Sequence, residues 1–437
     1  MTYFIVLNIL IVILLIIFFI YTYKKNSSKI TSVHLFVVLI LLFYPIGVLR
    51  SFLGFESLIG TTILYSDIKN QVVSLLFIMI LFFIFGYLSG YKIIFIKRKT
   101  QKHISLCVKK ELSFYLFETI IVLLIIIAIL LIVKIIFHYG IVYYFFHIDF
   151  LRQTLTGTSI INLLLFISFF LTIYLYLHNG LRKRYLLYIL FIIIEFIFLG
   201  YRGPILSLFI IFLFAWQKRK SNNIIKLNFR FIIYFILLFF FFLLLQNIRE
   251  SSTLIVINGE NNEYIYTQVL KRFFGFEILE VVYNKIILLN QYSFNTLLNN
   301  IEYFITYIIP RSIFHDKILP VSIEFSKNLF FDIGHRYFDT GGISPTIFGS
   351  LLWNFNIFGI FVIMIYGFFV NKIDNLFLYT KSFRKIVLII SLMIYIVLSA
   401  EAPENFVFFI WVFIILYFIF YVIFIIRKIT MFNERLR

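Results

Sequence analysis

Cysteine, acidic residues and charge of either sign are all scarce in this chain. Among its 437 residues, Cys107 is the single cysteine, which excludes an internal disulfide and leaves no cysteine-based zinc site. Asp and Glu number 20 against 39 Lys and Arg, and these four types make up only 14% of the residues. No Asp-x-Asp occurs, which argues against a metal-bound nucleotide-sugar donor. The sequence therefore predicts neither a cofactor nor a metal ion.

Apolar residues fill the chain instead. It is 62% hydrophobic and its mean hydropathy is +1.02, values that no soluble globular class explains. Apolar runs of membrane-spanning length recur along it, so we predict an all-α polytopic integral membrane protein. The first run has no basic residues before it and no small-residue cleavage site, so we expect a retained anchor rather than a signal peptide.

The apolar runs predict eleven transmembrane helices and one large outer loop that carries short helices. The predicted spans are 3–21, 33–49, 71–91, 116–137, 159–178, 185–199, 204–216, 230–246, 346–370, 385–400 and 405–426. They divide the chain into a first membrane bundle of about eight helices at 1–246, an extracytoplasmic loop at 247–345, and three last helices with a cytoplasmic tail at 346–437.

Lysine and arginine set the orientation of these helices. With the N-terminus outside, every predicted inner segment carries at least three basic residues, and every short outer segment carries at most two. Cytoplasmic loops of membrane proteins show this excess. The net charge of +19 is therefore an orientation signal, and we expect a multi-pass protein of the cytoplasmic membrane with no nucleic-acid partner.

One pair of predicted spans depends on breaking residues 185–216 at the sequence GYRGP, 200–204. A single helix over that segment would be about 48 Å long, against a hydrocarbon core of about 30 Å. A hairpin of two short arms puts both flanking basic clusters inside and leaves Arg202 at a tip below the outer headgroups. Arg202 either marks a turn in water or is held there to bind an anion, and we favour the second. We expect Glu195, in the first arm, to pair with a neighbouring helix.

The large loop contains both apolar and polar stretches. Apolar and charged residues mix over 265–290, which predicts an amphipathic helix on the outer surface, and 301–309 is another short apolar piece. The stretch IPRSIFHDKILP, 309–320, holds Arg311 between two prolines. A long outer loop of this kind usually builds a binding site or a lid.

The last part of the loop leads directly into the ninth predicted span. His335, Arg336 and Asp339 precede a Gly-Gly turn, and Gly342 with Ser344-Pro345 predicts the start of a helix. The N-terminus of that helix would face outward, where its positive dipole favours an anion.

These stretches resemble the Wzy-type O-antigen and capsule polymerases, the oligosaccharide repeat-unit polymerases. The resemblance rests on IPR followed by a lysine, on GGISPTIFGSLLWNFNIFG entering a helix, and on GYRGP after an apolar helix. It covers the whole architecture of about a dozen spans with one large outer loop. The chain departs from the family at Lys317-Ile318, where Lys-Pro is expected, and at Asn354-Phe355-Asn356, where Asn-Phe-Gly is expected.

The resemblance implies that a growing glycan passes from undecaprenyl pyrophosphate to a new lipid-linked repeat unit at the outer face. It also implies membrane lipids and a chain-length regulator protein as partners. Arginine binds phosphate oxygens through two parallel hydrogen bonds and stays charged when desolvated. The candidate pyrophosphate ligands are Arg202, Arg311 and, third, Arg336. The candidate general bases are His335, then Asp339, with Glu401 and Glu404 in reserve.

Three other functions compete with this interpretation. A flippase for lipid-linked oligosaccharides would show internal repeats and short loops on both faces, and the large outer loop has no counterpart in the first half. An O-antigen ligase would use the same donor, and the GGISPT segment favours the polymerase. An acyltransferase would need an inner histidine, whereas His34, His103 and His178 are expected at inner ends without an acid companion.

Overall fold

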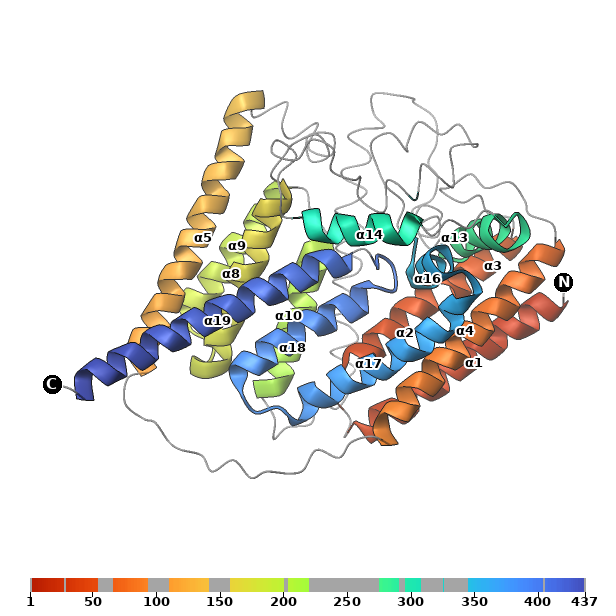
Figure 1. Ribbon diagram of the computed structural model, residues 1–437, viewed down its shortest axis with the longest axis horizontal. Coiled ribbons are helices and arrows are strands. Elements are labelled where there is room, and N and C mark those ends of the chain that lie inside the picture. Colours follow the sequence, from red (N-terminus) through yellow and green to blue (C-terminus); the bar gives the residue numbers. More distant parts are fainter. Residues whose placement is uncertain are drawn as a thin grey trace. The chain divides into compact units, whose positions relative to one another are not determined.

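The described residues of the computed structural model are helical throughout and contain no strand (Figure 1). These residues are 2–26, 29–53, 66–92, 110–140, 158–199, 203–219, 275–290, 295–307, 325, 345–403 and 405–435. Within them, 7 helical segments are long and apolar enough to cross a membrane. The predicted class of an all-α polytopic membrane protein is therefore supported. The number of eleven spans stays a prediction, and span 230–246 lies outside the described residues.

The chain forms two compact units, each built from segments that are distant in sequence. Unit 1 comprises Met1–Tyr91, Ser221–Asn375 and Tyr395–Phe406, and unit 2 comprises Lys92–Lys220, Leu376–Ile394 and Val407–Arg437. The sequence-based division at 246 and 345 is topological and stays a prediction.

Unit 1 contains three long helices and several shorter ones. The long helices are α1 (Thr2–Lys25), α4 (Ser66–Lys92) and most of α17 (Gly359–Tyr379). The shorter elements are α2 (Ser32–Phe43), α3 (Pro45–Leu53), α13 (Gly275–Tyr283), the π-helical turn η1 (Asn284–Leu288), α14 (Asn295–Thr306), α16 (Ile347–Phe355) and the 3-10 turn η4 (Asn356–Phe358).

Helices α4 and α17 cross at glycines. A Cβ added at Gly86 would overlap the carbonyl oxygen of Met364, and one at Gly367 would overlap that of Phe83. One turn further along α4, a Cβ at Gly90 would lie 2.5 Å from Oδ1 of Asn371. Small residues of this kind let helix backbones approach each other in membranes. Gly86 and Gly90 form a Gly-x-x-x-Gly pair, so the sequence itself carries a signal for this crossing.

Two of the predicted spans in unit 1 are broken. The first break lies at Tyr44, between α2 and α3, where Pro45 lacks the amide hydrogen that would continue the helix. The second lies at Asn356, whose φ of 53° ends α16 before α17 begins at Gly359. The predicted span 346–370 is therefore a short helix and a long one. Breaks at membrane depth occur where the freed backbone groups are buried in protein or line a cavity.

Unit 2 consists mainly of unbroken helices. They are α5 (Lys110–Tyr139), α8 (Thr158–Asn179), α9 (Lys183–Phe198), α10 (Gly203–Arg219), and most of α18 (Phe383–Leu398) and α19 (Asn405–Arg435). Aromatic side chains fill its core, with the ring centroids of Phe166 and Phe196 5.6 Å apart and those of Tyr174 and Phe420 5.0 Å apart. The break predicted between 199 and 204 is confirmed, because α9 and α10 are separate helices.

Basic side chains gather at one end of each unit, which we name its basic end. In unit 1, Lys25 at the end of α1 lies 3.7 Å from the ring of Tyr91 on α4, and Lys372 donates to the carbonyl oxygen of Gly90 at 3.1 Å. In unit 2, Arg184 at the start of α9 and Arg219 at the end of α10 both lie near the end of α8. This arrangement agrees with the predicted alternation of helix directions.

Candidate functional site

The residues predicted to bind pyrophosphate or to act as bases lie almost entirely outside the described residues. These are Arg202, Arg311, His335, Arg336, Asp339 and the reserve Glu404. Their roles stay predictions. The other reserve, Glu401, is exposed in the turn between α18 and α19. The structure does describe the helices that flank these residues, namely α9 and α10 around Arg202 and α16 after Asp339.

The start of α16 is the best-defined part of this region. Thr346 caps the helix in a left-handed backbone conformation, with φ 52° and ψ 166°, which is costly for a β-branched residue. The prediction that Ser344-Pro345 marks a helix start is confirmed, because α16 begins two residues later.

A buried tyrosine holds this strained start in place. Tyr44 lies at the break between α2 and α3, and its hydroxyl donates to Oγ1 of Thr346 at 2.8 Å. The amide of Phe348 donates to the same hydroxyl at 3.3 Å. The phenol oxygen thus accepts a hydrogen bond from one of the backbone amides that have no helical partner at the start of a helix. These contacts fix Thr346, which follows Asp339 by seven residues in the sequence, within unit 1.

Helix α13 packs beside this start and is buried. A Cβ added at Gly349 of α16 would contact Ile278 and Val282 of α13, and one added at Gly275 of α13 would lie 3.1 Å from Phe43 of α2. The hydroxyl of Tyr283 donates to Oε1 of Gln71 on α4 at 3.1 Å, and partial burial raises the pKa of this phenol. The expected surface helix over 265–290 is therefore wrong for α13, because all its residues except Val281 and Tyr283 are buried, the two glutamates included, and the helix packs against α3 and α16.

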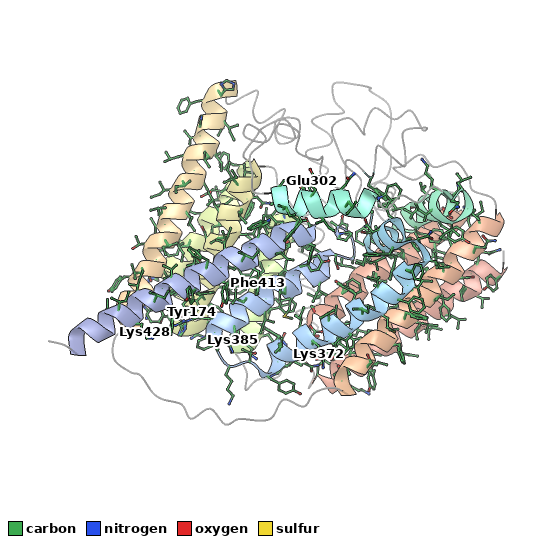
Figure 2. All side chains as sticks on the ribbon, in the orientation of Figure 1. Tyr174, Glu302, Lys372, Lys385, Phe413 and Lys428 are labelled. Carbon is green, nitrogen blue, oxygen red and sulfur yellow. The ribbon has the colours of Figure 1, made fainter. Side chains whose placement is uncertain are left out.

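Helix α14 presents the exposed apolar face that was expected of α13. Leu298, Ile301 and Ile305 are 50%, 50% and 62% exposed, and their spacing of three and four residues places them on one face. On another face, the ring of Phe304 stacks on that of Phe406 at the start of α19, with 6.4 Å between the centroids. Figure 2 shows Glu302 of α14 and Lys372 near the basic end at opposite ends of unit 1. Such a helix suits the interface between lipid and water.

A second polar cluster, which was not predicted from the sequence, lies at the basic end of unit 1. Asp374 of α17 is 1% exposed and accepts five hydrogen bonds. The amides of Ser32 and Val33 donate to its oxygens at 3.0 and 3.3 Å. The hydroxyl groups of Ser32, Thr31 and Tyr87 donate at 2.6, 2.8 and 3.1 Å. The carboxylate therefore caps the start of α2, where the helix dipole favours negative charge.

The same cluster contains His34. Its Nδ1 accepts the amide of Thr31 at 2.9 Å and its Nε2 lies 3.3 Å from the hydroxyl of Thr22, so its partners in the structure are threonines rather than an acid. His34, Thr31 and Asp374 are all buried, so no substrate reaches them. We interpret the cluster as a structural tie between α2, α4 and α17 rather than as a catalytic group.

Glu195 of α9 is another buried carboxyl group, and its surroundings differ from the prediction. It is 4% exposed, and neither oxygen has a hydrogen-bond partner among the described residues. Within the described residues, Glu195 therefore lacks the expected pairing with a neighbouring helix. Ile192 and Phe196, which are buried with it on α9, are apolar. A buried carboxyl group of this kind needs a proton or a cation.

Neither a search for metal-binding groups nor a comparison with known proteins identifies a further site. Within the described residues, no group of three His, Cys, Asp or Glu side chains could hold a metal ion. Comparison with known proteins found no matching protein family, curated protein or solved structure. Function must therefore be inferred from the residues and the geometry of this chain.

Proposed function

We propose that this protein is a polymerase of lipid-linked oligosaccharides. It joins undecaprenyl-pyrophosphate-linked repeat units into O-antigen or capsular polysaccharide on the outer face of the cytoplasmic membrane. The observation that carries this proposal is the start of α16. The GGISPTIF segment, which resembles the polymerases, leads into a helix whose strained first residue is held by Tyr44 at the break of another helix.

The position of this start also supports the proposal. Phe4 at the beginning of α1 contacts Phe276 of α13, with 5.9 Å between ring centroids, whereas the other end of α1 carries Lys24 and Lys25. The short helices α3, α13 and α16 therefore gather at the end of unit 1 opposite the basic end. The excess of basic residues supports a cytoplasmic basic end, which would put the short helices on the outer side.

In the proposed reaction, an acceptor hydroxyl on the new repeat unit attacks the anomeric carbon of the growing glycan. The bond from that carbon to the pyrophosphate oxygen breaks, and lipid pyrophosphate leaves with the bonding electrons. His335 accepts the proton of the hydroxyl, with Asp339 as second candidate. Arg202, Arg311 and Arg336 bind the departing pyrophosphate, whose negative charge grows as the bond breaks.

Helix α14 suits a substrate that arrives on a lipid. Its face of Leu298, Ile301 and Ile305 would lie in the outer leaflet, with Tyr303 and Tyr307 at the same level. The loop would then be held at the depth of the lipid headgroups. The pyrophosphate of a polyprenyl carrier lies at that depth.

A glycan ladder from cells that lack the gene tests this function. The proposal predicts single repeat units at the surface and no longer chains, with the ladder restored by the wild-type gene. Loss of all surface glycan would contradict the proposal and would indicate a flippase or an O-antigen ligase. The ligase remains a rival because it would use the same lipid-linked donor. Protein carrying His335→Ala should insert normally but fail to restore the ladder.

A further inference from the structure

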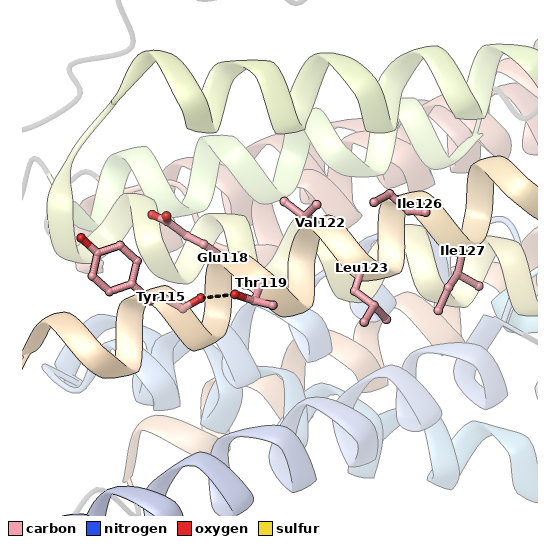
Figure 3. A pocket seen from close by; sticks show the side chains of 7 residues that line it. All are labelled: Tyr115, Glu118, Thr119, Val122, Leu123, Ile126 and Ile127. Carbon is pink, nitrogen blue, oxygen red and sulfur yellow. Dashed lines mark hydrogen bonds between the residues drawn. The ribbon is translucent and has the colours of Figure 1, made fainter.

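A groove of about 550 Å³ runs along an exposed face of α5 in unit 2 (Figure 3). It is independent of the proposed catalytic region. Its described lining comes entirely from α5 and consists of Tyr115, Glu118, Thr119, Val122, Leu123, Ile126 and Ile127. The lining changes in character along the helix, from three polar residues to four aliphatic ones. This order is that of a lipid, which has a polar head and an apolar chain.

The polar end of the groove lies at the basic end of unit 2. Arg184 at the start of α9 pairs with Glu118, with 2.7 Å between Nη1 and Oε2. The hydroxyl of Tyr185 lies 3.5 Å from the other oxygen of Glu118. The guanidinium carries further donors beyond the one that Glu118 accepts. It can therefore also hold a second acceptor from outside the protein.

The charge around this end is positive. Arg182, Lys183 and Arg184 are consecutive, and Glu118 supplies one negative charge, which leaves three minus one, or +2. Arg182 and Lys183 are exposed. Basic residues at the membrane surface attract anionic headgroups. The charge thus favours a phosphate that keeps its negative charge over a zwitterionic headgroup.

The length of the groove matches one leaflet. From Tyr115 to Ile127 the helix rises about 18 Å, slightly more than half of a hydrocarbon core of about 30 Å. We propose that this groove binds one anionic phospholipid of the cytoplasmic leaflet. Its phosphate lies at Arg182–Arg184, and one acyl chain lies along Val122 to Ile127.

Photo-crosslinking of the full-length protein in lipid nanodiscs tests this site. The probes are phosphatidylglycerol and phosphatidylcholine with the same photoreactive group at the end of an acyl chain, and the labelled residues are mapped by mass spectrometry. The proposal predicts label concentrated at residues 122–127 and more label from phosphatidylglycerol. Equal label from both lipids, no label in this range, or label spread evenly along α5 would overturn it.

Two sets of variants sharpen the test. Leu123→Trp fills the groove and should remove most of the label. Leu130→Trp is the matched control, because Leu130 is exposed on the same face two turns away but does not line the groove. The double change Arg182→Gln and Lys183→Gln should lower the preference for phosphatidylglycerol about fivefold for each residue. An unchanged preference in that double variant, or equal loss of label in the two tryptophan variants, would overturn the proposal.

Discussion

Unit 1 surrounds the buried carboxylate of Asp374 with five hydrogen-bond donors, whereas the described part of unit 2 gives the buried Glu195 none. Both side chains are almost fully buried in helices of apolar composition. Asp374 meets the start of α2, where amides lack helical partners, whereas Ile192 and Phe196, which are buried with Glu195 on α9, are apolar. Burial alone therefore does not tell whether a carboxyl group stabilises a fold.

The two units also differ in how their helices end. Unit 1 breaks two of its spans, at Tyr44 and Asn356, and joins the resulting short helices through hydrogen bonds. The described helices α5, α8, α9 and α10 of unit 2 run without such breaks. A break in a membrane helix leaves backbone amide and carbonyl groups without helical partners. Other parts of the protein must then supply hydrogen bonds to these groups. The proposed catalytic loop joins the unit that has them.

The largest expected effect is at Asp374. Asp374→Ala would leave the amides of Ser32 and Val33 and the hydroxyl of Tyr87 buried without an acceptor. We expect the free energy of unfolding to fall by at least about 3 kcal/mol, measured by denaturant titration of the purified protein in detergent. Asp374→Asn keeps one acceptor oxygen and should lose less. If Asp374→Ala were as stable as the wild type, Asp374 would not stabilise the fold and would not differ from Glu195 in this respect.

A smaller effect is expected at the tyrosine that holds α16. Tyr44→Phe removes a hydroxyl bonded to Thr346 and Phe348, which should cost about 1–2 kcal/mol of unfolding free energy. It should also shorten the polysaccharide, because the anchor of the catalytic loop is loosened. Tyr366→Phe is the control, since its hydroxyl bonds Ser399, at 2.6 Å, rather than a residue of α16. Equal glycan lengths in the two variants would show that the contact between Tyr44 and α16 does not affect polymerisation.

The smallest effect on stability is expected at Glu195. Glu195→Gln keeps the shape of the side chain and breaks no hydrogen bond within the described residues. The free energy of unfolding should change by less than about 1 kcal/mol in the same titration. A loss as large as that of Asp374→Ala would show that Glu195 has a partner, and the contrast between the units would fail.

Much of the fold could be predicted where length and charge decide the structure. The separation of α9 from α10 followed from the excessive length of one helix, and the start of α16 followed from Ser344-Pro345. The buried packing of α13 could not be predicted, because the partners that cover it lie far away in the sequence.

The polar contacts were less predictable than the helices. Thr31 and Ser32 are typical helix-capping residues, but the side chain that they bind, Asp374, lies 343 residues beyond Thr31. Glu195 differs from Asp374, since a charge in an apolar helix usually has a partner and the described residues offer it none. The spacing of Leu298, Ile301 and Ile305 does indicate the exposed face of α14, although the amphipathic helix was predicted in the preceding segment instead.

Polymer synthesis by the purified protein, reconstituted with lipid-linked repeat units, tests the proposed function most directly. Wild-type protein should give a ladder of chain lengths, Arg202→Ala should leave single repeat units, and Arg202→Lys should restore little, because lysine cannot make two parallel hydrogen bonds to phosphate. Arg152→Ala, another predicted outer arginine, should leave the ladder intact. Wild-type chain lengths from Arg202→Ala would contradict the account.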